Sequence, residues 1–484
     1  MNNVADILKQ IPREEIHRAV QRRLFEVSFF EFVKWAAKQL EPQTDFKWGF
    51  YHEYICDILQ EETIRIKNKE PKKKNIIINV PFRSSKSLIV SVFYPIWSWI
   101  VNPQMEFINL SYSADLSTDH SNKVIALLSH PKFRELYDDW DFVETHKSKT
   151  DFKLKRGGTR MSGGFTGSIL GHGGDVIIMD DPNSPKQLSN VERHNTIKAW
   201  VDTISTRLNN PDTGIFILIQ QRLHQEDLTG YLLNNEPDNW EHVVFPAELT
   251  DKVRPIHLAA KYVDNLLQPE RFSKKVLDNF RKVLGSVGYS NQLLQEATTA
   301  EGNIIKRNWI IIKPIETILD LKLRWEMIVD TAQTEKKKND PSGILIFAKH
   351  NNSIIVRKII EKRFQFPDLV DYLVKIYEEY RIKRIWVEPK SSGLDVINYL
   401  KRKTNVHISN LPAPTDDKLT RLNAASPFIE DGKLILIEDA SNSIIIEQLT
   451  GFPQVIHDEA VDLVSYSVNN FLNKNKGLNY KFIN

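Results

Sequence analysis

The sequence predicts an α/β protein with more than one domain, and three observations support this fold class. Between Asn75 and about Phe245, short apolar runs typical of strands alternate with helical segments, which favours a largely parallel sheet. After a polar stretch over 250–300, a second strand-rich region begins at Trp325. The length of 484 residues leaves room for two or three domains with their own cores.

These patterns divide the chain into four segments. Residues 1–45 are polar and helical, with apolar side chains at helix-like spacing. Residues 46–290 are expected to form the first α/β domain, 291–303 a linker, and 304–484 the second domain. Strands of the first domain are expected at 76–80, 107–111, 176–179, 215–220 and 243–245.

Composition excludes several classes of protein. The formal net charge is only +3, so any grip on nucleic acid must come from local basic patches such as 65–74. Cys56 is the single cysteine, which excludes an internal disulfide and a cysteine-rich zinc site. The N-terminus is polar, and the most apolar stretch, 88–101, is too short to span a bilayer. We therefore expect a cytosolic protein without a membrane segment.

A polar turn follows the first expected strand. It reads Pro81-Phe-Arg83-Ser84-Ser85-Lys86-Ser87 and leads into the apolar stretch 88–101, which we expect to be a buried helix. A phosphate-binding loop needs a helix N-terminus, a lysine for the β and γ oxygens, and a hydroxyl for magnesium. Lys86 and Ser87 meet the last two needs, while Val80 and Ser85 replace the usual glycines. Alone, the segment is more typical of an ordinary polar strand-to-helix turn.

The expected strand at 176–179 ends in Asp180, Asp181 and Pro182. A carboxylate at that place reaches the hydration shell of a nucleotide-bound magnesium ion, and a second one polarises the attacking water. We assign these two roles to Asp180 and Asp181, although aspartate is shorter than the glutamate more usual in the second. The basic turn and the acidic strand end together predict a P-loop ATPase domain of the RecA/ASCE type that binds ATP and Mg²⁺.

The second domain begins with three expected strands at 325–330, 343–349 and 354–360, which have short connections. Helix, strand, helix, strand and a closing helix follow at 367–380, 384–387, 394–400, 406–411 and 460–471. Three antiparallel strands followed by alternating helices and strands are the element order of an RNase H-like fold.

Four acidic residues in this domain are candidate metal ligands. Asp330 and Glu388 end two expected strands, and Asp458 and Asp462 lie four residues apart at the start of the closing helix. The first and fourth strands of an RNase H-like sheet are neighbours, and the last helix packs across their ends. Carboxylates converging from three segments suit Mg²⁺ or Mn²⁺ and the two-metal hydrolysis of a phosphodiester.

Two alternatives concern the same region. The sequence Glu388-Pro-Lys390 also fits the Glu-x-Lys of restriction-type nucleases, a fold that does not need the acids of the last helix. Lys418 and Arg421 are candidate contacts to DNA phosphates, or ordinary residues of an exposed polar loop.

Several ordered motifs across most of the chain resemble the large subunit of tailed-bacteriophage terminases. The first is the glycine-poor loop 81–87, and the acidic strand end follows it. The others are Leu110-Ser-Tyr-Ser113, Gly163-Gly-Phe-Thr-Gly167, Gly171-His-Gly-Gly174, Gln221-Arg-Leu-His-Gln-Glu-Asp-Leu228, Val329-Asp-Thr-Ala332, Val387-Glu-Pro-Lys-Ser-Ser-Gly393 and His457-Asp-Glu-Ala-Val-Asp462.

The resemblance implies roles for further residues. Arg83 would sense or stabilise the γ-phosphate, with Ser84 and Ser85 beside it in the loop. Arg222 would couple hydrolysis to motion, or simply close a strand end. Other implied positions are Arg207 as an arginine finger toward a neighbouring subunit, 48–52 as the adenine-side region, and Asp340 as an accessory acid. Which of Asp458 and Asp462 is the principal ligand stays open, and His457 is a possible helper.

The resemblance also implies a function and partners. The ATPase would translocate double-stranded DNA into a procapsid, and the nuclease would cut concatemeric DNA. Partners would be the portal protein, a small terminase subunit and further copies in a ring, in the host cytoplasm and transiently at the portal vertex. Two alternatives are a helicase-nuclease of repair or restriction, which needs a second RecA-like domain, and a catalytically silent prophage remnant that binds the portal.

Overall fold

The computed structural model describes residues 12–472, apart from 139, 168, 170, 184–189, 298–303, 332–340, 390–391, 413–415, 440, 454 and 456. The chain forms two compact units, Met1–Asp278 with Gly288–Thr298, and Asn279–Val287 with Thr299–Asn484. Helix α10 (Lys274–Gln292) occupies a polar region in which we expected no regular element, and part of the expected linker lies outside the described residues. In the described part, no helix is long and apolar enough to cross a membrane.

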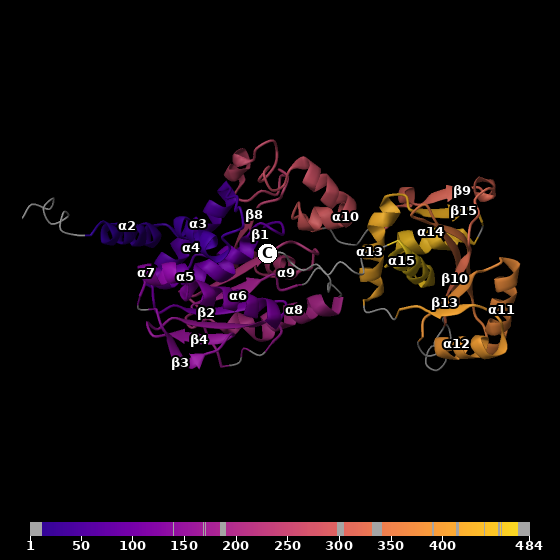
Figure 1. The fold of residues 1–484 in the computed structure, drawn as a ribbon, viewed down its shortest axis with the longest axis horizontal. Helices are drawn as coiled ribbons and strands as arrows, with labels where there is room; N and C mark the ends of the chain where they lie inside the picture. Colours follow the sequence, from indigo (N-terminus) through magenta and orange to yellow (C-terminus); the bar gives the residue numbers. More distant parts are fainter. Residues whose placement is uncertain are drawn as a thin grey trace, which may run out of the picture. The chain divides into compact units, whose positions relative to one another are not determined.

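Unit 1 contains an eight-stranded sheet in the order β3-β4-β5-β2-β6-β7-β1-β8 (Figure 1). The five expected strands are confirmed as β1 (Asn75–Asn79), β2 (Glu106–Ser111), β6 (Val176–Asp180), β7 (Ile215–Gln220) and β8 (Trp240–Val244). Each adjacent pair among β5, β2, β6, β7, β1 and β8 is parallel, as expected for an α/β domain. Three strands at one edge were not expected; they are β3 (Phe142–Lys147), β4 (Asp151–Leu154) and β5 (Thr159–Gly164). Strand β4 pairs antiparallel with both β3 and β5, whereas β5 pairs in parallel with β2.

Helices cover both faces of this sheet because its strands are apolar on both sides. Phe107 of β2 lies in one core cluster and Ile108, its neighbour along the chain, in the other. The larger cluster joins the sheet to α2 (Arg13–Val27), α3 (Phe29–Leu40), α4 (Phe50–Lys67), η1 (Leu88–Phe93), α5 (Tyr94–Val101), α6 (Ala114–Leu128) and α7 (Pro131–Leu136). The smaller one includes residues of α8 (Asn190–Asp202) and α9 (Leu228–Asn235).

Unit 2 contains a seven-stranded sheet in the order β14-β13-β10-β11-β12-β15-β9 (Figure 1). The expected strands are β10 (Glu326–Asp330), β11 (Ser342–His350), β12 (Ser353–Lys362), β13 (Arg384–Val387) and β14 (Ile408–Asn410). Strands β10, β11 and β12 are antiparallel neighbours, and β13 pairs in parallel with β10. This confirms the expected RNase H-like order. The two strands added beside β12, β15 (Leu434–Ile437) and β9 (Ile311–Lys313), were not expected.

Two helical layers enclose the second sheet. Apolar side chains of α11 (Phe366–Glu379) and α12 (Ser392–Lys403) share one core cluster with Met327 and Val329. On the other face, α13 (Lys418–Glu430), α14 (Asn442–Gly451) and α15 (Glu459–Phe471) share a cluster with Ile328 and Leu345. The closing helix therefore packs on the sheet, as the sequence predicted, and it reaches β10, β11 and β12.

Buried histidines in unit 1 make its stability depend on pH. Burial, helped by arginine charges nearby, lowers the pKa of both His52 and His242 from 6.5 to about 3. The folded state keeps these rings neutral, whereas the unfolded chain takes up protons below its pKa. Acid therefore favours unfolding from about pH 6.5 downward, with a slope of at most about 1.4 kcal/mol per pH unit for each histidine.

We predict that the His242→Gln variant loses less stability in acid than the unchanged protein. Between about pH 7 and pH 5.5, its free energy of unfolding should fall by about 1 kcal/mol less, because one proton acceptor of the unfolded chain is gone. Urea unfolding followed by tryptophan fluorescence measures the difference. Equal losses in both proteins would contradict the assignment of a neutral, partly buried His242.

Candidate functional site

The first site lies at the carboxyl ends of β1, β7 and β6, which are adjacent in that order. The loop 81–87 follows β1, Gln221 follows β7, and Asp181 follows β6. Because parallel strands end at one edge of the sheet, these three segments come together. The structure thus brings the basic turn and the acidic strand end to one place, with the β7 end between them.

The loop takes up a conformation usually associated with glycine, without containing one. Arg83 and Ser85 both have a φ of 58°, in the left-handed region that is unfavourable for most side chains. Two side chains support the loop from outside through its carbonyl groups. His52 Nδ1 accepts from the Gly49 amide (2.8 Å), so Nε2 carries the proton and donates to the Ser84 carbonyl (3.0 Å). Arg271 Nη1 donates to the Arg83 carbonyl.

Lys86 and Ser87 each contact one of the two aspartates. The Lys86 ammonium lies 3.0 Å from Asp181 Oδ2, and Ser87 Oγ donates to Asp180 Oδ1 at 2.9 Å. Lys86 is only 5% exposed and Asp180 only 1%, so these contacts lie largely out of water. Burial raises the pKa of both carboxyl groups, while Lys86 lowers both.

The residues of this site fit a magnesium nucleotide. Hydroxyl and carboxylate oxygens are the ligands that Mg²⁺ prefers, and Ser87 and Asp180 present both side by side. The buried Ser84 hydroxyl has no hydrogen-bond partner among the described residues. Arg83 is exposed beside the loop, which leaves its guanidinium accessible to a phosphate.

The Arg222 side chain makes its hydrogen bonds within the turn before α9, away from the phosphate loop. Its Nε donates to both oxygens of Asp227 (3.1 and 2.9 Å), and Nη2 donates to the carbonyls of His224 and Gln225. The guanidinium therefore holds the turn before α9. The link to the site is instead the backbone amide of Gln221, which donates to Asp181 Oδ1 at 3.2 Å.

Two further candidate positions, Arg207 and Trp48, make contacts typical of ordinary packing and turns. The Arg207 guanidinium donates to the Thr203 carbonyl and the Thr206 hydroxyl, both in the same turn. Trp48 stacks on Phe46 and meets His52 edge-on, as a packed aromatic residue does. Their roles as an arginine finger and as part of an adenine-side region stay predictions.

The second site lies at the ends of β10 and β13. Val329 pairs with Val387 in the parallel ladder, so Asp330 and Glu388 follow as neighbours at one edge of the sheet. Tyr466 on α15 donates to Glu388 Oε2 at 2.9 Å and so connects the closing helix to that strand end. Asp340, the candidate accessory acid, lies outside the described residues.

Negative charge is concentrated around Asp330. Burial, and after it the charges of Asp462, Glu388 and Glu459 in that order, raise its pKa to about 7, against the lowering effect of Lys418. Asp462 thus acts on Asp330 more strongly than any other carboxylate.

Two basic side chains of α13 partly neutralise this cluster. Lys418 Nζ lies 2.9 Å from Asp462 Oδ2 and also contacts Asp458, and Arg421 pairs with Asp462. In the described part of the chain, no three Asp, Glu, His or Cys side chains are arranged as a ready-made metal site. The oxygen donors suit Mg²⁺ or Mn²⁺ chemically, but Asp458 and Asp462 would have to exchange their basic partners for the metal.

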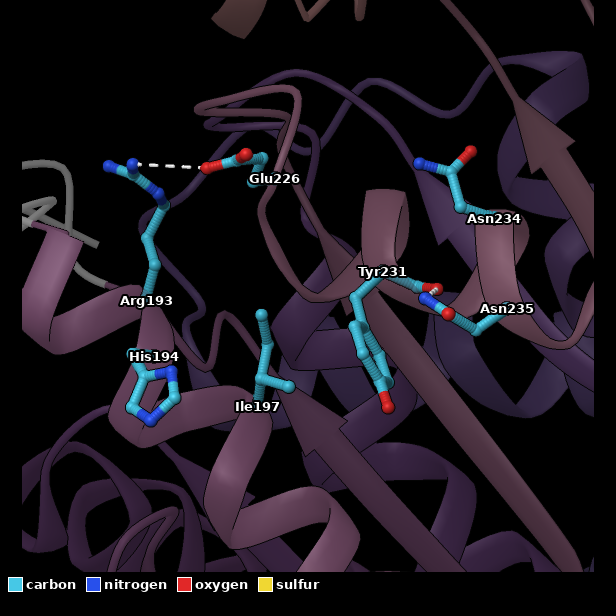
Figure 2. A pocket seen from close by; sticks show the side chains of 7 residues that line it. All are labelled: Arg193, His194, Ile197, Glu226, Tyr231, Asn234 and Asn235. Atoms are coloured by element: carbon cyan, nitrogen blue, oxygen red, sulfur yellow. Dashed lines mark hydrogen bonds and ion pairs between the residues drawn. The ribbon is translucent and has the colours of Figure 1, made fainter.

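A hollow of about 410 Å³ lies between α8 and the segment around α9 (Figure 2). Its lining includes the ion pair between Arg193 and Glu226 (3.4 Å), with Ile197 and Tyr231 below it in the view. None of the candidate residues of either site lines it. It is therefore separate from the chemistry described above.

Comparisons with known proteins give likenesses to phage large terminases. No protein-family model and no curated protein matches the chain. The solved large terminase from the thermophilic bacteriophage D6E in complex with ADP is 14% identical, with 85% of this chain and 99% of that chain covered and a TM-score of 0.46. The HK97 bacteriophage large terminase is 10% identical, with 85% and 89% covered and a TM-score of 0.37.

The second unit alone has its own likeness. The large terminase nuclease from thermophilic phage G20c with bound magnesium is 13% identical, with 35% of this chain and 98% of that chain covered and a TM-score of 0.28. At these identities and TM-scores, an assignment of function rests on the residues of the two sites rather than on the likeness.

We predict that His52→Leu weakens nucleotide binding. The variant removes the donor to the Ser84 carbonyl and the acceptor for the Gly49 amide, so the strained loop loses a support. The KM for ATP should rise about tenfold or more, since each lost buried hydrogen bond costs about 1–3 kcal/mol. Steady-state ATP hydrolysis measures this, with Thr63→Val as a matched control that breaks buried hydrogen bonds between α4 and α5. An unchanged KM in His52→Leu would contradict the supporting role.

We predict that Gly393→Ala disturbs the strand end that carries Glu388. A Cβ at Gly393 would lie 2.1 Å from the Glu388 carbonyl oxygen, so the backbone on one side must move. DNA cleavage should fall with little change in ATP hydrolysis, and unit 2 should lose about 1–3 kcal/mol of stability. Gly163→Ala is the control, because its nearest neighbour would lie at 3.5 Å. Full cleavage activity in Gly393→Ala would argue against this tight approach.

Proposed function

We propose that this chain is the large subunit of a phage terminase, an ATP-driven DNA translocase that also cuts DNA. The observation that carries the proposal is the pairing of two sites in one chain. One is a phosphate-binding loop whose Ser87 and Lys86 contact two strand-end aspartates. The other is a crowded set of carboxylates on a sheet of RNase H-like order.

In the ATPase, the loop amides and Lys86 would bind the β- and γ-phosphates, and Arg83 would add positive charge at the γ-phosphate. Ser87 and Asp180 would hold Mg²⁺, which when bound neutralises charge on the phosphates. Asp181 would orient and polarise the attacking water once its Lys86 partner turns to the phosphates. The Gln221 amide on Asp181 then provides a path from hydrolysis to the turn around Arg222.

In the nuclease, Asp330, Glu388, Asp462 and Asp458 would hold Mg²⁺ or Mn²⁺, which when bound supplies an activated water and neutralises the scissile phosphate. Lys418 and Arg421, released from the carboxylates, would be available to DNA phosphates. Such contacts are sequence-independent, so DNA binding should weaken as salt rises.

The proposal extends to partners. The substrate would be double-stranded, concatemeric viral DNA in the host cytoplasm. Portal protein, a small terminase subunit and further copies of this chain in a ring would complete the motor. The helicase-nuclease alternative is not favoured, because the second sheet carries the RNase H-like order instead of a second phosphate-binding loop.

The test compares three proteins in two assays. The wild type, Lys86→Ala and Asp330→Ala are assayed for ATP hydrolysis with Mg²⁺ and for cleavage of supercoiled plasmid with Mn²⁺. Lys86→Ala should lose ATP hydrolysis by about 100-fold or more and keep cleavage, because only the phosphate loop is changed. Asp330→Ala should show the reverse, because it removes a metal ligand.

Each opposite result has a definite meaning. Cleavage that persists in Asp330→Ala would remove the nuclease assignment, and hydrolysis that persists in Lys86→Ala would remove the ATPase assignment. A wild type without either activity, also in the presence of DNA, would favour the silent portal-binding alternative.

A further inference from the structure

Arg160 is a buried arginine for which neither site described above has a use. It lies on β5 and is 0% exposed, among the largest fully buried side chains of the described chain. Its Nε donates to Ser162 Oγ (3.0 Å) and Nη1 to the Ser91 carbonyl (2.8 Å), while Nη2 has no hydrogen-bond partner among the described residues. A guanidinium is almost never fully buried unless a carboxylate or a special demand compensates for its desolvation.

Part of the reason for a buried guanidinium lies in the helix that follows the phosphate loop, where one carbonyl group needs a hydrogen-bond donor. Pro95 has no backbone N–H, so the Ser91 carbonyl lacks its usual α-helical partner four residues on. The helix passes through the π-helical segment η1 at this place. Arg160 supplies the missing donor. A neutral amide would do this equally well, so the carbonyl alone does not explain a buried cation.

The same turn of helix leads to the metal-binding carboxylate. Ser91 Oγ donates to Asp180 Oδ2 at 2.7 Å, while Ser87, one turn earlier, donates to Oδ1 at 2.9 Å. Both oxygens of Asp180 are therefore fixed by the helix to which Arg160 is bound. Parallel pairing also places Arg160 on the Asp180 face of the sheet: Phe107 pairs with both Arg160 and Val176, and Val176 lies four residues before Asp180.

The electrostatic relation agrees with this geometry. Burial is the main influence on the Asp180 carboxyl and raises its pKa. The Ser91 hydrogen bond, the Lys86 charge, the Ser87 hydrogen bond and, last, the Arg160 charge lower it. Lys86 is needed at the phosphates when nucleotide binds. Arg160 contacts Ser162 and the Ser91 carbonyl, neither of which belongs to the loop 81–87, so it can hold these contacts without being needed at the phosphates.

We propose that Arg160 is a positioning residue for Asp180: it supplies a buried positive charge and, through Ser91, fixes the carboxylate in the orientation that binds the nucleotide's metal. This inference rests on the proposed ATPase. It assigns Arg160 no contact with ATP. Its loss should therefore weaken metal binding and turnover far more than it weakens binding of the metal-free nucleotide.

The test measures three quantities. They are the affinity for the Mn²⁺ ion whose binding depends on ADP, the affinity for ADP in EDTA, and kcat for ATP hydrolysis. For Arg160→Met we expect ADP-dependent Mn²⁺ affinity and kcat to fall about tenfold or more, with ADP affinity in EDTA within about threefold of wild type. Arg160→Lys restores the charge and should recover most of the Mn²⁺ affinity. Thr63→Val, a buried hydrogen-bond variant of α4 that does not touch Asp180, controls for general destabilisation.

The inference is overturned if Arg160→Met keeps its Mn²⁺ affinity, if Thr63→Val loses as much, or if Arg160→Lys fails to recover it. If Arg160→Met does not fold, Arg160→Lys and Ser91→Ala decide: Ser91→Ala should weaken ADP-dependent Mn²⁺ binding about fivefold or more, and wild-type affinity would refute the link.

Failure of the proposed ATPase gives a different pattern. A wild type that binds no Mn²⁺ with ADP, or one whose binding is unaffected by Lys86→Ala, removes the ATPase and this inference together. If the wild type binds Mn²⁺ with ADP and loses this binding in Lys86→Ala, the ATPase stands. If all Arg160 and Ser91 variants then bind Mn²⁺ as well as the wild type, this inference alone is removed.

Discussion

The first site depends on keeping one buried carboxylate, Asp180, in a fixed place. A carboxylate that is 1% exposed is costly to desolvate, so the surrounding chain must compensate for its charge. Two hydroxyls from successive turns of the helix after the loop fix its two oxygens, and His120 Nδ1 lies 3.6 Å from Oδ2. The helix, the loop that precedes it and the sheet edge are thereby held in one arrangement around the place where a metal would bind.

The second site solves an opposite problem, because its carboxylates repel one another. The charges of Asp462, Glu388 and Glu459 raise the pKa of the partly buried Asp330, and the Lys418 charge lowers it. Lys418 and Arg421 belong to α13, a helix on the same face of the sheet as α15. Their ion pairs hold Asp458 and Asp462 at the start of α15. A divalent cation bound there would have to compete with these basic groups for the same oxygens.

Elements that a local pattern defines could be predicted, and elements that depend on distant partners could not. The run Ile215–Gln220 is apolar throughout and was predicted at its observed bounds. By contrast, β9 is three exposed residues that form a strand only because β15 pairs with it from more than 100 residues away. Strand β5 was missed because its polar residues, Arg160 among them, do not resemble a buried strand.

The candidate sites follow the same rule. The acids and the loop were found because each lies at the end of an apolar run. The role of His52 was missed because its partner is a backbone carbonyl, which leaves no trace in the sequence. Strand β7 lies between β1 and β6, so its end lies beside the acidic strand end. The bond from the Gln221 amide to Asp181 uses main chain on one side, so side-chain variation at 221 leaves this donor in place. The contact between the acidic strand end and the turn before α9 can thus persist while the sequence of that turn changes.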